Sequence, residues 1–283
     1  MKIPIIINHS IPYFIKSAEN IAEGIKKSGN VPIILNNVEA RDRTDRELFE
    51  KCVFLDKDIP LGLKMEIAGT RLFNNIGSIE LCSDKRRINA FLKNDFPVPA
   101  TIDYPLTYFP NESFFGDFSD KVCDELGLPV VAKLAFGSQG REVFLLNSKE
   151  EITEFQKKYY LTPHLYQKYV ESSKGRDQRV YVVGKNAVAS VIRENENDFR
   201  SNIAIGGKAY KAEISDETAS LCVDVSTMLG LDFCGIDLLL TPEGPLVCEV
   251  NANALFTALN EACGIETGHI IAEHVVLYRL GSL

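Results

Sequence analysis

The feature that most constrains the fold is the stretch CGIDLLLTPEGPLVCEVNAN at residues 234–253. It contains two apolar runs, Ile236–Leu240 and Leu246–Val250, on either side of a Thr-Pro-Glu-Gly-Pro segment. Proline fixes one backbone dihedral angle and glycine permits unusual ones, so this segment is typical of a tight chain reversal. The stretch therefore predicts two antiparallel strands joined by a loop of odd length centred near Glu243.

Three polar side chains interrupt this apolar hairpin. Glu249 and Asn251 are two residues apart and point to the same face of a strand, and the expected loop places Asp237 across from Glu249. Carboxylates grouped in an apolar setting are costly unless a partner compensates their charge. A Mg²⁺ ion that holds the phosphates of a nucleotide is one such partner, and basic side chains at the end of a sheet are another. This stretch alone leaves both explanations open.

Composition narrows the class of protein. The 283 residues are enough for two or three small domains. The net charge of −8 argues against nucleic acid or an anionic membrane as the main partner. The 7 scattered cysteines include no Cys-x-x-Cys pair, which predicts reduced thiols in a cytoplasmic protein. The apolar run at the N-terminus is too short for a signal peptide, and no run approaches the ~18 residues of a membrane span.

The first part of the chain alternates strands with helices, which predicts a small parallel α/β domain. The expected elements are strands at Ile3–Asn8, Val31–Leu35 and Cys52–Leu55 and helices at Ile11–Lys27 and Leu61–Ala68. The first strand-to-helix turn lacks glycine, so it does not match the dinucleotide-binding fingerprint. His9 and Ser10 in this turn could contact a substrate, but capping of the following helix is the more usual role of serine.

A lysine within an apolar run is the main signal of the middle part. Lys133 interrupts the predicted buried strand Leu128–Leu134, and a buried lysine needs a phosphate or a carboxylate as partner. The glycine-containing loop at residues 137–140 could cover phosphates, although a plain hairpin turn explains it equally well. Before this strand, Ser83 or Asp84 is expected to cap a helix, whereas the segment Tyr104–Ser119 has no pattern that assigns an element.

The remaining predicted elements alternate similarly. They are a helix at Lys85–Asn94, a strand at Glu142–Leu146, a helix at Ser148–Lys158, strands at Leu165–Val170, Arg176–Val183 and Ala187–Arg193, and helices at Glu217–Leu229 and Thr267–Leu280. Asp177 and Arg179 alternate with apolar neighbours and are therefore expected on one face of their strand.

Seven motifs in order give the chain a family resemblance. They are FLDKDIP, ELCSDKRR, PVVAKLAFGSQGR, YQKYVESSKGRDQRVYVVG, DFRSN, LGLDFCGIDLL and GPLVCEVNAN. Together they resemble the ATP-grasp superfamily, in the branch of ribosomal protein S6 glutamate-modifying (RimK-like) carboxylate–amine ligases. The resemblance implies a mixed α/β and α+β protein with the ATP-grasp fold. Residues 1–83 would form an N-terminal pre-ATP-grasp α/β domain, residues 84–164 a central lid, and residues 165–283 a C-terminal antiparallel α+β domain.

The resemblance also implies an activity. Such enzymes join the carboxylate of a small molecule or peptide to the amine of an amino acid such as glutamate, through an acyl phosphate, and release ADP and phosphate. It further implies a homo-oligomer. Two alternatives stay open: an ATP-grasp kinase or ATP-binding module that forges no amide, and a D-alanine–D-alanine-type ligase.

The resemblance assigns roles to individual residues. ATP would contact Lys85, Lys133, Ser138, Gln167, Lys168, Tyr169, Val170, Asp177, Arg179, Arg200 and Asn202. Two Mg²⁺ ions, or Mn²⁺ in their place, would be held by Asp237, Glu249 and Asn251. Arg200 and Lys133 are the catalytic candidates, because phosphoryl transfer needs positioning and cations more than a nucleophile. Cys234 and Cys248 are expected to point away from the site and pack.

Three positions depart from the family pattern. Glu142 stands where relatives often have glycine, and Lys168 stands where an acidic residue is common beside the adenine. After Asn251 the chain continues Ala-Asn-Ala-Leu-Phe-Thr, where glutamate ligases commonly have a turn resembling Ser-Pro-Gly. That last segment borders the acceptor site, so we expect room for a substrate that differs from those of the named relatives.

Overall fold

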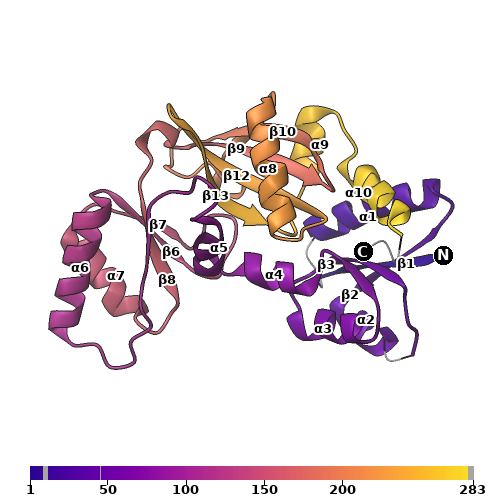
Figure 1. Cartoon of the computed structure of the whole chain (residues 1–283), viewed down its shortest axis with the longest axis horizontal. Helices are drawn as coiled ribbons and strands as arrows, with labels where there is room; N and C mark the ends of the chain where they lie inside the picture. The colour runs from indigo at the N-terminus through magenta and orange to yellow at the C-terminus, as the bar shows by residue number, and fades with distance from the viewer. Residues whose placement is uncertain (9–11, 45, 280–283) are drawn as a thin grey trace.

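The computed structural model describes residues 1–8, 12–44 and 46–279, and its chain forms three sheets along an elongated molecule (Figure 1). His9, Ser10, the predicted helix start at Ile11 and the predicted helix end at Leu280 lie outside the described residues. Within the described part, none of the helices combines the length and apolar character that crossing a membrane requires.

The N-terminal sheet is parallel, as the sequence predicted. Its strand order is β2-β1-β3-β4, and it lies at the same end of the molecule as both described chain ends (Figure 1). The strands are β1 (Lys2–Ile7), β2 (Val31–Asn36), β3 (Lys51–Leu55) and β4 (Arg71–Phe73). The helices are α1 (Pro12–Lys27), α2 (Asn37–Thr44), α3 (Ile59–Ile67) and α4 (Ile76–Ser83). The order reverses between β1 and β3, because the chain leaves β1 to one side for β2 and returns to the other side for β3.

A second sheet forms the lid at the opposite end of the molecule (Figure 1). Its order is β5-β8-β6-β7, all antiparallel. The strands are β5 (Thr101–Asp103), β6 (Val130–Leu134), β7 (Val143–Leu146) and β8 (His164–Lys168), covered by α6 (Glu112–Leu126) and α7 (Lys149–Tyr159). The predicted domain boundary between residues 164 and 165 falls inside β8, whose partners β5 and β6 belong to the lid.

The C-terminal sheet lies between these two and is antiparallel, with order β11-β10-β9-β12-β13. The strands are β9 (Arg176–Val183), β10 (Asn186–Glu194), β11 (Lys208–Lys211), β12 (Phe233–Thr241) and β13 (Gly244–Asn251). The helices are α5 (Lys85–Leu92), which joins the first domain to the lid, and α8 (Asp216–Met228), α9 (Thr257–Cys263) and α10 (Thr267–Leu277). Asp84 caps α5, since its carboxylate accepts the backbone N–H of Arg86 at 2.9 Å.

In the β12–β13 hairpin Asp237 faces Glu249 as predicted, but the turn and the strand register differ from the prediction. The turn has two residues rather than an odd number, because Thr241 pairs directly with Gly244. A register shift after Asp237 then leaves Cys248 as an extra residue, so Asp237 lies opposite Glu249 as expected. This β-bulge re-aims the side chain of Cys248, which is the usual effect of one extra residue in a strand.

The clusters of buried apolar side chains do not correspond one to one with the three sheets. Two clusters of buried residues each combine the N-terminal and the C-terminal sheets: one joins Phe54 to Ile236, and the other joins Ile5 to Tyr181. The lid has a cluster of its own. The last helix also returns to the first domain, where the buried Lys51 ammonium donates to the carbonyl oxygens of Val275 at 2.8 Å and Tyr278 at 2.6 Å. The N- and C-terminal parts therefore form one packed body that carries the lid.

Candidate functional site

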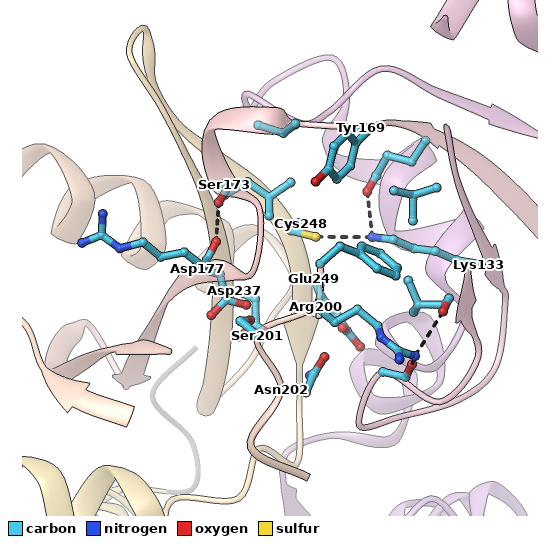
Figure 2. Close-up of a pocket in the computed structure, with 18 of the residues that line it drawn as sticks. Lys133, Tyr169, Ser173, Asp177, Arg200, Ser201, Asn202, Asp237, Cys248 and Glu249 are labelled. Atoms are coloured by element: carbon cyan, nitrogen blue, oxygen red, sulfur yellow. Dashed lines mark hydrogen bonds between the residues drawn. The ribbon is translucent and has the colours of Figure 1, made fainter. Parts of the chain in front are cut away.

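A cleft of about 820 Å³, its open mouth included, separates the lid from the C-terminal sheet. Twelve predicted site residues line it: Lys85, Lys133, Ser138, Gln167, Lys168, Tyr169, Val170, Asp177, Arg200, Asn202, Asp237 and Glu249. The cleft lining does not include Arg179 and Asn251. Figure 2 shows Tyr169 at one end, Asn202 at the other, and Lys133 reaching in from the lid.

Lys133 is the most unusual charge in this cleft. Its residue is only 9% exposed, and its ammonium donates to the Gln167 amide oxygen at 2.7 Å and lies 3.3 Å from the Cys248 sulfur. Neither partner is charged, and the described residues place no carboxylate in an ion pair with Lys133. The sequence left phosphate and carboxylate open as partners. An anionic ligand in the cleft is the partner that this environment still favours.

Two further cations hold the glycine-containing loop between β6 and β7. The ammonium of Lys85 donates to the Gly137 carbonyl at 3.0 Å, and the Arg200 guanidinium donates to the Gly140 carbonyl at 2.6 Å. Burial lowers the pKa of Lys85, nearby Lys133 and Lys57 lower it further, and Glu249 opposes the shift. Three positive side chains thus surround the part of the cleft beneath this loop.

The carboxylate of Asp237 is compensated by arginines. Arg179 binds both of its oxygens, at 2.6 and 2.7 Å, and Arg193 lies 3.0 Å from one of them. Burial alone would raise the pKa of Asp237, but these two guanidinium groups hold it below its usual range. Arg193 also binds Asp177 through two hydrogen bonds. Basic side chains, one of the two kinds of partner that the sequence left open, are therefore present at Asp237.

Glu249 and Asn251 have fewer polar partners than Asp237. The nearest cation to Glu249 is the Lys85 ammonium at 3.9 Å, and the Nδ2 atom of Asn251 is buried without a hydrogen-bond partner in the described part of the chain. The described residues contain no group of three or more His, Cys, Asp or Glu side chains that could hold a metal. Two carboxylates and an amide fit Mg²⁺ nonetheless, because Mg²⁺ commonly takes one or two carboxylates and completes its shell with water and phosphate oxygens.

One expectation about the cysteines is wrong. Cys248 lines the cleft and faces Lys133 (Figure 2), because the bulge turns its side chain away from the packed face. Burial raises the pKa of its thiol, and the Lys133 charge only partly opposes this shift. Cys234 is completely buried among apolar residues, as expected.

Sequence reasoning missed three charged residues of the cleft, Glu142, Arg176 and Arg193. Arg193 is 3% exposed and links Asp177 to Asp237, which makes it the centre of the charge network behind the carboxylates. An arginine at the end of an apolar run is the same signal that identified Lys133. Glu142 was noted only as a departure from the family, but its carboxylate accepts the backbone N–H of Ser138 at 3.3 Å and lines the cleft.

Comparisons with known proteins agree with this geometry. A family model described as a RimK-like ATP-grasp domain matches residues 85–275. N-acetylaspartylglutamate synthase A of Homo sapiens is 36% identical over 228 residues, which are 78% of this chain and 56% of that protein. A probable alpha-L-glutamate ligase of Stenotrophomonas maltophilia (strain K279a) is 36% identical over 220 residues, 75% of this chain and 71% of that protein. The chain thus spans little more than half the length of the first relative.

A solved structure gives the fold. The ATP-grasp ligase PsnB, complexed with a phosphomimetic variant of its minimal precursor, Mg and ADP, matches with a TM-score of 0.70 at 17% identity, over 97% of both chains. This likeness confirms the predicted ATP-grasp fold. The matched segment of the family model contains every residue of the cleft. The chain belongs to the RimK-like ATP-grasp family.

Proposed function

We propose that the protein is an ATP-dependent carboxylate–amine ligase that forms an amide bond and releases ADP and phosphate. The observation that carries the proposal is the buried ammonium of Lys133, which faces the cleft between the lid and the C-terminal sheet with only neutral partners. The family assignment supports the same activity, because the two relatives described above are named a synthase and a ligase of glutamate compounds.

The proposed reaction has two steps. The carboxylate takes the terminal phosphoryl group of ATP, which gives an acyl phosphate and ADP. The substrate ammonium loses a proton to give the amine, whose nitrogen attacks the carbonyl carbon. The C–O bond to phosphate then breaks, the nitrogen releases a second proton, and the amide and phosphate leave. Lys133, Lys85 and Arg200 would neutralise the transferred phosphoryl group, and Arg200 would also stabilise the tetrahedral centre. Such preorganised charge is the main means of catalysis in phosphoryl transfer.

Nucleotide and metal would divide the cleft between them. Gln167, Lys168, Tyr169 and Val170 would line the adenine, and Asp177 the ribose. Asp237, Glu249 and Asn251 would hold two Mg²⁺ ions. When bound, Mg²⁺ neutralises charge on the phosphates. Arg179 would act through Asp237, because its guanidinium binds that carboxylate and does not line the cleft.

The amine substrate that we favour is L-glutamate. The product named for the human relative joins an N-acetylated aspartyl group to glutamate. An N-acetylated acid has no free amine, so the amine of that amide must come from glutamate. We assign the same role to L-glutamate here, with the carboxylate partner a small molecule or a peptide.

An isotopic experiment tests the activity. The protein is supplied with ATP, Mg²⁺, L-glutamate and a panel of ¹⁸O-labelled dicarboxylic acids, N-acetylated amino acids and short peptides. We expect ADP release that depends on both carboxylate and amine, with one labelled oxygen in phosphate for each amide formed. Label in AMP, or in no phosphate-containing product, would disprove the acyl-phosphate path. A stable phosphorylated product without amine would identify a kinase instead.

A further inference from the structure

Two buried acceptor atoms without partners lie where the N-terminal sheet meets the end of β13. The Asp56 residue is 3% exposed, and its Oδ2 atom has no hydrogen-bond partner among the described residues. The same holds for Oδ1 of Asn253. The two residues are in contact, because the Asn253 amide donates to the Asp56 backbone carbonyl at 2.9 Å. Buried polar atoms are seldom left unpaired, so each such atom needs an explanation.

The surroundings hold Asp56 in place and leave one of its oxygens available. Its Oδ1 atom accepts hydrogen bonds from the side chain of Asn8 at 3.2 Å and from the backbone N–H groups of Lys57 at 2.6 Å and Asp58 at 3.2 Å. All of these donors bind one oxygen. The described part of the chain contains no cation in an ion pair with this carboxylate, and an uncompensated buried carboxylate is costly.

The location is one where ligands bind in sheets of this kind. Asn8 follows β1 and Asp56 follows β3, and the strand order reverses between these two neighbouring parallel strands. In open α/β sheets, ligands bind beyond the carboxyl ends of the strands at such a reversal. Asn8, Asn253 and Lys57 retain partial or full exposure, so a ligand could approach from their side.

The same place is linked to the proposed metal ligands along the chain. Asn253 follows the proposed metal ligand Asn251 by two residues. The buried Asn74 fixes this segment, because its amide donates to the Ala252 carbonyl at 2.7 Å.

We infer that Asp56 and Asn253 bind the ammonium group of the amine substrate. The inference rests on the proposed function and adds a substrate-binding site in the N-terminal domain. An ammonium group has three N–H donors and no acceptor, which matches two acceptor atoms without donors of their own. Its positive charge compensates the Asp56 carboxylate. Bound there, the nitrogen lies beside the segment that leads from the proposed metal ligands.

A ligand pair and matched variants test this site. L-glutamate and glutarate share both carboxylates and differ in the ammonium group, and each is titrated calorimetrically into the protein with an ATP analogue and Mg²⁺. We expect wild type to bind L-glutamate ~10- to 100-fold more tightly than glutarate, which is the usual value of hydrogen bonds to a charged group. Asp56→Asn retains the acceptor for the three local donors and should abolish this difference. Asn253→Ala should reduce it.

Asp58→Asn is the control. Asp58 lies on the same loop, but its carboxylate caps α3 and pairs with Arg41, and asparagine caps helices about as well as aspartate. This variant should bind both ligands as wild type does. In turnover, Asp56→Asn should raise KM for L-glutamate by the same factor and leave KM for ATP unchanged.

The inference and the proposed function fail differently. Equal binding of L-glutamate and glutarate by wild type, or an unchanged preference in a folded Asp56→Asn, overturns the inference and leaves the ligase activity intact. Weaker Mg²⁺ binding in Asp56→Asn with unaltered L-glutamate binding also overturns it, in favour of a cation site. Absence of ADP release with every acid and amine of the panel overturns the proposed function itself.

Discussion

At the scale of single residues, the two carboxylates of the β12–β13 hairpin are in different states although they face each other. Asp237 is compensated by Arg179 and Arg193, whereas Glu249 has only the Lys85 ammonium at 3.9 Å. A buried ion pair contributes little net stability, because desolvation offsets most of the attraction. Glu249 is therefore the carboxylate that is freer to exchange its partner for a metal ion.

The first prediction concerns Glu249. Glu249→Gln preserves size and removes the charge that would bind Mg²⁺ and phosphate. We expect ATP turnover to fall on the order of 10²- to 10³-fold, the usual effect of losing one charge-stabilising group. Glu243→Gln, at the exposed tip of the same hairpin, is the control and should retain full turnover. Near-wild-type turnover in a folded Glu249→Gln would remove this residue from the site.

The second prediction concerns acid stability of the lid. His164 is fully buried, is stacked on Tyr104 at 4.1 Å between ring centroids, and has its pKa lowered to about 4 by burial. Its folded-state pKa is below that of the unfolded chain, ~6.5. Protonation therefore favours unfolding: the stability is complete above pH ~6.5 and is lost as the pH falls toward 4. Between pH 7 and pH 5 the loss should be about 2 kcal/mol.

Urea unfolding of wild type and His164→Gln at pH 7 and pH 5 measures the contribution of His164 to the free energy of unfolding. Carboxylates titrate alike in the two proteins, so the difference between their pH dependences isolates the histidine. Equal loss of stability in both proteins would show that the pKa of His164 does not differ between the folded and the unfolded chain.

How much of the site could be predicted is seen from particular residues. Side-chain alternation and the expected loop predicted that Asp237 lies opposite Glu249, and it does. In the structure, however, a two-residue turn and a β-bulge take the place of the expected loop of odd length. Cys248 could not be placed, because alternation does not indicate where a strand gains an extra residue. The role of Arg193 depends on β9, β10 and β12 lying side by side, which is a property of strand pairing and not of spacing along the chain.

At the scale of elements, the loop between β6 and β7 is shaped by its contacts with the segment around Arg200. Gly140 has φ +75°, and a Cβ atom there would lie 2.5 Å from the side-chain oxygen of Asn202. The Gly140 carbonyl is also the acceptor for Arg200. The loop therefore depends on glycine here for two reasons, backbone conformation and space.

The third prediction separates these two reasons. Gly140→Ala combines strain with a clash against Asn202, whereas Gly264→Ala combines a left-handed backbone, with φ +67° and ψ +37°, with no atom within 4 Å of the new Cβ. Both should lose ~1 kcal/mol of stability from the left-handed backbone. Only Gly140→Ala should lower kcat/KM for ATP, by ~10- to 100-fold, because misplaced groups lose orientation. Equal kinetics in the two variants would show that the loop position does not matter for turnover.

Element prediction succeeded where periodicity was clean and failed where it was mixed. The helix α6 was missed because the segment Tyr104–Ser119 ends in its middle. Its buried face, from Phe115 and Phe118 through Val122 to Leu126, becomes visible only when the window extends further. The predicted domain boundary between residues 164 and 165 divides β8, because its pairing with β6 joins residues 30 to 38 positions apart, which local periodicity does not indicate.

At the scale of the whole molecule, the three sheets do not have three separate cores. Apolar side chains of the N-terminal and C-terminal sheets share two clusters, and the lid has one of its own. Ile5 of β1 packs in the same cluster as residues of β9 and α10, whereas Ile152 of α7 packs only with lid residues. Cooperative unfolding units follow such packing, so we expect two units in this protein and not three.

The last prediction tests this division with two buried isoleucines, both 0% exposed. Each alanine substitution should cost about 2–5 kcal/mol, the usual effect of a cavity in a packed core. Hydrogen exchange followed by mass spectrometry should show Ile152→Ala raising exchange in β6, β8 and α6 alone. Ile5→Ala should raise exchange in β1 and β3 and equally in β9 and β12, although these strands belong to different sheets. If β9 keeps its protection while β1 loses it, the N-terminal sheet is an independent unit, and the shared clusters do not couple the proposed ammonium site to the cleft.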